Sequence, residues 1–188
     1  MNKPLLIGST ASPFVRRIRI LLSDREFDFK VINVMSPEGQ EELAKHSNTR
    51  RVPVLIVEGK EIFDSTIMAS YLLGRDFSLE EKLFMKEVDE ACDAALLLFQ
   101  LKMFEMDSDR SSRLGKILDG RLKRILTALN EKTSELSDDY GIRENWLYTF
   151  LDWLSYREVE NWSEYKNLVT FYEVNSSRPE ILETNPRV

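Results

Sequence analysis

The amino-acid sequence predicts a two-part protein, with an α/β domain over residues 1–74 and an all-helical domain over residues 78–188. In the first part, short apolar runs alternate with stretches of helical periodicity, which is the pattern of a sheet covered by helices. Two apolar runs within residues 54–63 flank a glycine-containing loop and predict a β-hairpin. After the linker at residues 74–78, only helical periodicity remains. The expected order in the first part is β-α-β-α-β-β-α, around a mixed four-stranded sheet.

The first predicted strand, Leu5–Ile7, leads through a loop of small residues into a strong helix start at Ser12-Pro13. Serine suits the N-cap, and proline suits the first helical position because its missing N–H would be unpaired there in any case. A second strand is expected within Phe27–Val34, and a short acidic helix over Pro37–Lys45. The polar face of the first helix is expected to consist of Arg16, Arg17, Arg19, Asp24 and Arg25.

The hairpin is predicted from Val54–Val57 and Glu61–Phe63, joined by the three-residue loop Glu58-Gly59-Lys60. Pro53 precedes the first of these strands, where its missing N–H costs least. A cis bond between Val52 and Pro53 would leave the backbone groups of Val52 outside the sheet.

Asp64-Ser65 follows the hairpin and precedes a run of helical periodicity, which predicts a helix capped by a carboxylate or a hydroxyl. The free backbone at Val52 and this helix N-terminus would together be able to hold the two ends of a small peptide-like ligand. An ordinary hairpin followed by a capped helix has the same pattern. In the helical part, further helices are predicted after the Ser78/Glu81 capping box, over 113–136, 146–156 and 165–174, and after Arg178-Pro179.

The composition narrows the class of protein. Of 188 residues, 43% are hydrophobic and 31% charged, as in folded globular proteins. The net charge of −6 disfavours a general nucleic-acid surface, which requires clustered lysine and arginine. One cysteine, Cys92, and one histidine, His46, exclude a disulfide framework and a His/Cys metal cluster. Without a membrane-length apolar run or a signal-peptide core, a cytoplasmic location is expected, with no membrane partner.

Three motifs in this order resemble the glutathione S-transferase family. Ser-Pro-Phe-Val-Arg-Arg-Ile-Arg at 12–19 resembles the first-helix signature of the bacterial transferases, especially the YibF-like group. Val-Pro-Val-Leu at 52–55 and Phe-Asp-Ser at 63–65 resemble the glutathione-binding signature. The helix at 151–157 and the tail motifs Ser-Arg-Pro and Thr-Asn-Pro resemble the last helices of the family. The resemblance implies a thioredoxin-like domain over 1–74, a helical bundle over 78–188, and a homodimer.

The resemblance also implies that the protein binds reduced glutathione as a co-substrate, without a metal, and transfers it to a small electrophile. Its implied site residues are Ser12 for the sulfur, Val52 and cis Pro53 for the cysteinyl backbone, Asp64 and Ser65 for the γ-glutamyl end, and Arg51 near the glycine carboxylate. A hydroxyl donor at a helix N-terminus favours a thiolate over a thiol through its hydrogen bond and the helix dipole. A plain N-cap is the other explanation for Ser12, and Ser9 or Thr10 would be next in line for the sulfur.

The sequence departs from the family pattern in the loop 47–51, which lacks the usual proline and glycine, and at Gly141/Glu144, where half of a reciprocal helix cap is missing. These departures keep open a second class of function, a non-catalytic interaction protein resembling stringent starvation protein A. Cys92 is expected to be buried and inert, and His46 to be solvated in a polar loop. An apolar acceptor pocket, or simply core, is expected from Phe99, Met103, Met106 and Trp153.

Overall fold

The structure is a computed structural model that describes residues 3–136 and 139–188. Contacts divide the chain into two compact units, Met1–Phe77 with Pro179–Val188, and Ser78–Arg178. The predicted fold class is confirmed, since a mixed four-stranded sheet with helices is followed by a helical region.

The predicted domain ranges, 1–74 and 78–188, remain a prediction. By contacts, the segment after Arg178 groups with the first unit and not with the helices that precede it. The expectation that no signal peptide is present depends in part on residues 1–2, which lie outside the described ranges.

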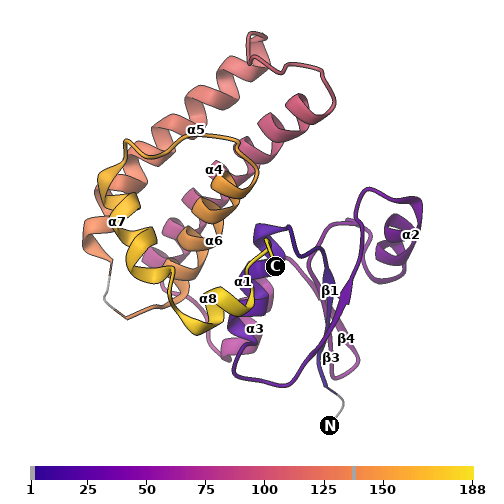
Figure 1. The fold of residues 1–188 in the computed structure, drawn as a ribbon. Helices are drawn as coiled ribbons and strands as arrows, with labels where there is room; N and C mark the ends of the chain where they lie inside the picture. Colours follow the sequence, from indigo (N-terminus) through magenta and orange to yellow (C-terminus); the bar gives the residue numbers. More distant parts are fainter. Residues whose placement is uncertain (1–2, 137–138) are drawn as a thin grey trace. The chain divides into compact units, whose positions relative to one another are not determined.

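The first unit is built on a sheet with the strand order β2-β1-β3-β4 (Figure 1). The strands are β1 (Leu5–Gly8), β2 (Asp28–Val31), β3 (Val54–Val57) and β4 (Lys60–Phe63). β1 is parallel to β2 and antiparallel to β3, which is antiparallel to β4. The hairpin turn is shorter than predicted, because Lys60 pairs with Val57 and leaves only Glu58 and Gly59 between the strands. Both turn residues have positive φ, as a type I′ turn requires.

Three helices cover this sheet: α1 (Pro13–Leu21), α2 (Pro37–His46) and α3 (Ser65–Leu73). Their N-caps are Ser12, Ser36 and Asp64, and each cap side chain accepts a hydrogen bond from a backbone N–H of the first turn. α1 and α3 lie on one face of the sheet and α2 on the other (Figure 1).

Buried apolar side chains fill both faces of the sheet, because successive residues of β1 and β3 point in opposite directions. The face towards α1 and α3 holds Leu6, Val15, Ile18, Leu22, Leu55, Met68 and Leu72. The face towards α2 holds Ile7, Leu43 and Val54. The two central strands are therefore fixed from both sides, and so are the loops that leave their ends.

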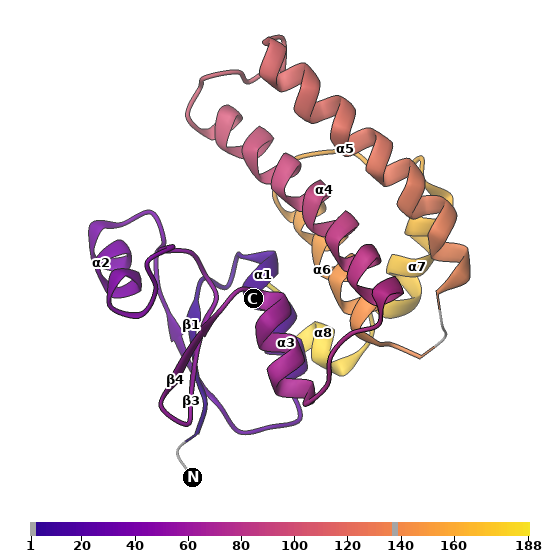
Figure 2. The ribbon, with the colours of Figure 1, turned by 180° about the vertical axis from the view of Figure 1, so that it is seen from behind.

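The second unit consists of α4 (Leu79–Met103), α5 (Arg113–Lys132), a 3₁₀ turn (Thr133–Glu135), α6 (Ile142–Tyr156) and α7 (Lys166–Asn175). α4 and α5 pack side by side (Figure 2). α6 supplies much of the core, and its Trp146 and Phe150 have no exposed surface. α6 begins earlier than predicted, at Ile142, where the Glu144 carboxylate accepts a hydrogen bond from the Gly141 N–H at 3.0 Å. Half of a reciprocal cap is thus present, as the sequence indicates.

The C-terminal segment folds back onto α1. Its helix is α8 (Pro179–Glu183), and Thr184 follows it. The Arg16 guanidinium donates to the Ile181 carbonyl at 3.0 Å and to Thr184 Oγ1 at 3.3 Å. Arg19 donates to the carbonyls of Thr184 and Glu183, both at 3.3 Å. These hydrogen bonds satisfy backbone carbonyls at the end of a short helix.

The prediction that the arginines of α1 form an exposed polar face is wrong for two of them. Arg16 is 3% exposed and Arg17 is 0% exposed. The Arg17 guanidinium lies 4.9 Å from the centre of the Phe14 ring, over its face. The helix therefore buries two of its charged residues instead of presenting them to solvent.

Within the described ranges, each helix is too short or too polar to cross a membrane. The same residues contain no group of three or more His, Cys, Asp and Glu side chains arranged to hold a metal ion.

Candidate functional site

The register of the sheet brings the three sequence motifs to one end of the first unit. Ile7 of β1 lies opposite Val54 of β3, which lies opposite Phe63 of β4 on its other side. The chain leaves β1 and β4 at this end and enters β3 there. Because neighbouring strands lie about 4.8 Å apart, the three segments begin within about 10 Å of one another. These segments carry the predicted site residues Ser12, Val52, Pro53, Asp64 and Ser65.

Ser12 caps α1 and lies partly buried at its N-terminus. Its Oγ accepts a hydrogen bond from the Val15 N–H at 3.3 Å, and no acceptor for its own hydroxyl hydrogen occurs among the described residues. The helix starts close to β1 because Gly8 has no side chain, since a Cβ there would lie 2.5 Å from Val15 Cγ2. Ser9 Oγ accepts a hydrogen bond from the Ala11 N–H at 3.4 Å. The Ser12 hydroxyl is thus able to donate to a ligand atom beyond the N-terminus of the helix.

The peptide bond between Val52 and Pro53 is cis, as predicted. Pro53 is buried, and the Val52 side chain packs against the apolar clusters on both faces of the sheet. In residues 3–136 and 139–188, no hydrogen bond engages the Val52 backbone. Its N–H and C=O are therefore able to pair with an extended peptide ligand, in the way that a sheet edge pairs with a strand.

Asp64 and Ser65 form the start of α3. Asp64 Oδ1 accepts hydrogen bonds from the N–H groups of Thr66 at 2.9 Å and Ile67 at 3.2 Å. The φ of Asp64 is 72°, an uncommon conformation for a residue with a side chain, and such residues cluster at ligand sites. Ser65 is 5% exposed, and its N–H and hydroxyl have no hydrogen-bond partner in the described part of the chain. The helix start therefore offers donors to an anion and a carboxylate oxygen to a cation.

The loop 47–51 takes its shape from hydroxyl groups, although the proline and glycine of the family pattern are absent. Ser47 Oγ and Thr49 Oγ1 are 2.8 Å apart, and Thr49 Oγ1 accepts from the Arg51 N–H at 3.4 Å. Arg50 has a φ of 50°, so a non-glycine residue adopts the left-handed conformation in this loop. The Arg51 side chain is exposed, and within the described ranges it has no ion-pair or hydrogen-bond partner.

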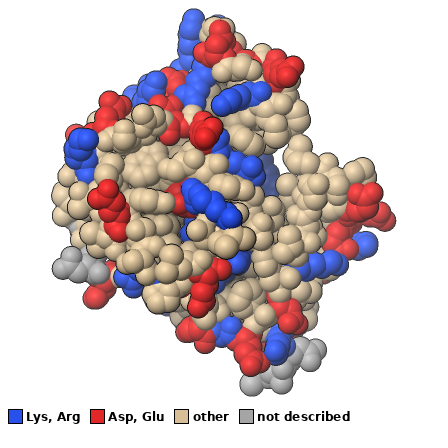
Figure 3. Space-filling model, viewed as in Figure 1, with Lys and Arg blue, Asp and Glu red and all other residues tan. Residues whose placement is uncertain are grey.

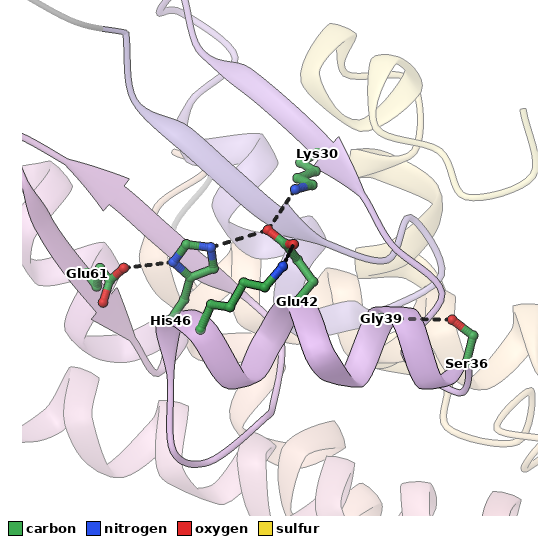
Figure 4. A network of polar contacts seen from close by, with 7 residues as sticks. Lys30, Ser36, Gly39, Glu42, His46 and Glu61 are labelled. Atoms are coloured by element: carbon green, nitrogen blue, oxygen red, sulfur yellow. Dashed lines mark hydrogen bonds and ion pairs between the residues drawn. The ribbon is translucent and has the colours of Figure 1, made fainter.

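A network of charged side chains ties α2 to the sheet where this loop departs (Figure 4). The Glu42 carboxylate accepts hydrogen bonds from Lys30 of β2 at 2.6 Å and from Lys45 at 3.2 Å. These bonds, the one from Lys30 above all, lower the pKa of Glu42 to about 2. The His46 ring lies between two carboxylates, with Nε2 3.3 Å from Glu42 Oε1 and Nδ1 2.7 Å from Glu61 Oε1 of β4.

The prediction of a solvated His46 in a polar loop is therefore wrong. His46 is the last residue of α2, and its side chain is only 19% exposed. The spacing of Glu42 and His46 on one helix face is visible in the sequence, but the contact with Glu61 depends on the fold. Acidic side chains gather over α2 in Figure 3, and elsewhere on that face acidic and basic side chains are interspersed.

In the second unit, the candidate acceptor residues separate into two pairs. Phe99 and Trp153 make an edge-to-face contact, with ring centroids 5.9 Å apart, and Trp153 is buried. Met103 and Met106 are exposed at the end of α4 and beyond it, so these two residues are not core. A pocket lined by the four remains a prediction. Cys92 is buried, as predicted.

Comparisons with known proteins agree with this geometry. Residues 6–78 match the sequence model of the glutathione S-transferase N-terminal domain. The uncharacterized GST-like protein YibF of Escherichia coli (strain K12) is 40% identical over 68 residues, which are 36% of this chain and 34% of YibF. The chain thus matches about a third of the length of this curated relative.

Solved structures of glutathione transferases share the whole fold. A family member from Pseudomonas fluorescens Pf-5, solved with bound glutathione, has a TM-score of 0.86 at 20% identity and covers 99% of this chain and 100% of its own. A glutathione S-transferase from Methylobacillus flagellatus KT, solved with GSH bound, has a TM-score of 0.84 at 19% identity. The match covers 97% of this chain and 98% of that structure's chain. The Tau class glutathione S-transferase of mango (Mangifera indica) has a TM-score of 0.76 at 17% identity. The match covers 97% of this chain and 92% of the mango chain.

Proposed function

Because the chain carries the N-terminal domain of the glutathione S-transferase family and has the fold of these transferases, we propose that it binds reduced glutathione and activates its thiol for attack on an electrophile. One observation carries the proposal. It is the strand register, in which the segments that carry Ser12, the Val52 backbone and the start of α3 meet at one end of the sheet, and this supports the binding of a single tripeptide by all three.

Each part of glutathione has a complementary group in this arrangement. The Val52 N–H and C=O pair with the cysteinyl backbone, and Pro53 shapes the turn that presents them. The α-carboxylate of the γ-glutamyl end accepts hydrogen bonds from Ser65, and its ammonium pairs with Asp64. Arg51 is the cation for the glycine carboxylate. In this assignment both ends of the ligand are held by charge and the middle by backbone.

The hydroxyl of Ser12 donates a hydrogen bond to the glutathione sulfur. The Val15 N–H donates to Ser12 Oγ at 3.3 Å, which polarises the hydroxyl and strengthens the hydrogen bond that it donates onward. A thiol titrates near 8.5 in water, so a donor that stabilises the thiolate raises the reactive fraction at neutral pH. The thiolate then forms a bond to an electrophilic carbon, and the leaving group departs with its electron pair. Ser9 and Thr10 are the alternative donors.

The proposal includes a homodimer in the cytoplasm and a small electrophile as the second substrate. Support for a second copy comes from the second unit, in which α4 and α5 pack side by side and expose apolar side chains. These are Leu83, Leu97, Leu114 and Ile117. A soluble homodimer would cover such residues, and light scattering of Leu83→Glu against the unchanged chain tests this part.

A non-catalytic interaction protein on the same fold is the second candidate. The departures at loop 47–51 and at the α6 cap favour it, because they fall where the transferase pattern is otherwise regular. Such a protein would keep the fold but would not need donors that are free to face a ligand.

Retention on immobilised glutathione, followed by turnover of 1-chloro-2,4-dinitrobenzene, distinguishes the candidates. We expect retention, and we expect Ser12→Ala to lower the thiolate fraction of bound glutathione by about tenfold, as measured by ultraviolet absorbance. Ser36→Ala is the matched control, because Ser36 caps α2 as Ser12 caps α1. No retention would favour the interaction protein. Retention with unchanged turnover in Ser12→Ala would move the role to Ser9 or Thr10.

A further inference from the structure

His46, the last residue of α2, lies between two carboxylates that belong to different elements (Figure 4). Its Nδ1 is 2.7 Å from Glu61 Oε1 of β4, and its Nε2 is 3.3 Å from Glu42 Oε1, one turn earlier in α2. The side chain is only 19% exposed, so the ring is held in this position from both sides. The contact with Glu61 ties the end of α2 to the outer strand of the sheet.

Only the protonated ring satisfies both contacts. An ionised carboxylate is solely an acceptor, whereas imidazolium carries a hydrogen on each nitrogen and donates to Glu42 and Glu61 at once. The neutral ring has a single N–H. In either tautomer, its other nitrogen turns a lone pair towards a carboxylate oxygen, and one of the two contacts becomes repulsive. The link between α2 and β4 is therefore strongest when His46 is a cation.

Two ammonium groups complete the network around the ring. Lys30 of β2 donates to Glu42 Oε1 at 2.6 Å, and Lys45 of α2 donates to Glu42 Oε2 at 3.2 Å. Glu42 thus keeps two cationic partners when His46 is neutral. Glu61 differs, because it forms no second ion pair with the residues that the structure describes. The tie between α2 and β4 through this carboxylate therefore depends on the state of His46.

The loop 47–51, which carries Arg51, starts directly after His46. Ser47 is buried, its N–H closes the last turn of α2, and the Arg50 N–H donates to the Ser47 carbonyl at 3.1 Å. At its other end the loop runs into the buried Pro53. Because this loop is short and its path begins at the end of α2, release of that end frees the loop as a unit.

We propose that His46 is a pH-sensitive clamp: its protonation ties α2 to β4 and thereby holds the loop 47–51, and Arg51 with it, in one position. Loss of the proton loosens the loop, and histidine is the side chain that ordinarily changes charge near neutral pH. The inference rests on the proposed function only where Arg51 binds glutathione. There, the affinity for the glycine carboxylate falls as the pH rises.

Amide hydrogen exchange of the full, untagged chain tests the clamp. The chain has one histidine, so no second imidazole contributes. Between about pH 5.5 and about pH 7.5, we expect the protection factors of the Ser47 and Arg50 amides to fall by about two- to fivefold, the range for a partly exposed ion pair. Protection should stay low throughout in His46→Gln. It should stay high in His46→Arg, which keeps a cation with several donors.

Two further variants separate the clamp from the stability of α2. Ser36→Ala removes the N-cap at the other end of the helix and should keep the pH response, whatever it costs in protection. Glu61→Gln should abolish the response, because an amide can accept from the protonated ring and donate to the neutral one. A flat profile in the unchanged chain, or a response that persists in His46→Gln, would overturn the inference.

Glutathione and its C-terminal amide, which differ only in the charge of the glycine end, test the link to Arg51 by calorimetry. The ratio of their affinities should fall by about two- to fivefold over the same pH range and stay constant in His46→Gln. A constant ratio in the unchanged chain would overturn the link to Arg51. A loop that responds to pH in a chain that binds neither ligand would instead overturn the proposed function and support the clamp by itself.

Discussion

α1 and α2 lie on opposite faces of the same sheet, yet they are held in different ways. α1 is fixed by the buried Arg16 and the partly buried Arg19, which donate to backbone carbonyls of the C-terminal segment. α2 is fixed by side-chain ion pairs around Glu42, with Lys30 and Lys45 about half exposed. This difference indicates which helix of the first unit is held more rigidly. α1, which Ser12 caps, is held by hydrogen bonds to backbone carbonyls. α2, which precedes the loop with Arg51, is held by ion pairs that salt and acid can weaken.

The largest expected effect is on the α1 side. We expect Arg16→Met to lower the free energy of unfolding by about 3 kcal/mol, because the carbonyl of Ile181 and the Thr184 hydroxyl lose a charged donor in a buried place. Arg19→Met, whose partners lie nearer the surface, should cost less. Denaturant unfolding of the full chain measures both. Equal losses for the two variants would contradict a special role of the buried arginine.

A smaller effect distinguishes α3, on the same face of the sheet as α1, from α2 by function. Asp64→Ala and Ser36→Ala each remove an N-cap and should each cost about 1 kcal/mol of stability, measured by denaturant unfolding. Only Asp64→Ala should also abolish retention on immobilised glutathione. If both variants lose retention, stability and not the site would explain the result.

Acid should release α2 before α1. The pKa of Glu42 in the folded protein is about 2, below its ordinary value of 4.5, so its stabilising contacts are fully present above about pH 4.5 and are lost as the pH falls through about 2. Amide hydrogen exchange in α2 should therefore accelerate over this window while that in α1 changes less. Glu42→Gln should remove this pH dependence. Parallel acceleration in both helices would show that the network is not what holds α2.

The smallest effect is that of salt. Raising the ionic strength to about 1 M screens exposed pairs, each of which is worth at most about 1 kcal/mol. Exchange protection of α2 should fall by a few-fold at most, and that of α1 should stay the same. A larger fall in α1 would reverse the comparison.

Local signals in the sequence predicted the helix starts and the hairpin that carry the candidate site residues. Ser12-Pro13 and Asp64 mark helix starts within a few residues, and the hairpin fixes which ends of β3 and β4 meet. What the sequence did not predict depends on distant partners. The buried Arg16 donates a hydrogen bond to the carbonyl of Ile181, 165 residues away in the sequence. The ring of His46 contacts the carboxylate of Glu61, 15 residues away. The apolar run predicted a helix only from Trp146, whereas α6 begins at Ile142, directly after the half cap formed by Gly141 and Glu144.

The return of residues 179–188 to α1 sets an order of events during synthesis. The sheet and its three helices emerge from the ribosome early, but Arg16 finds its acceptors only after the whole helical unit has been made. Until then this guanidinium has no carbonyl of that segment to donate to. The first unit is therefore completed only after the helical unit has been synthesised, although its sheet is made first.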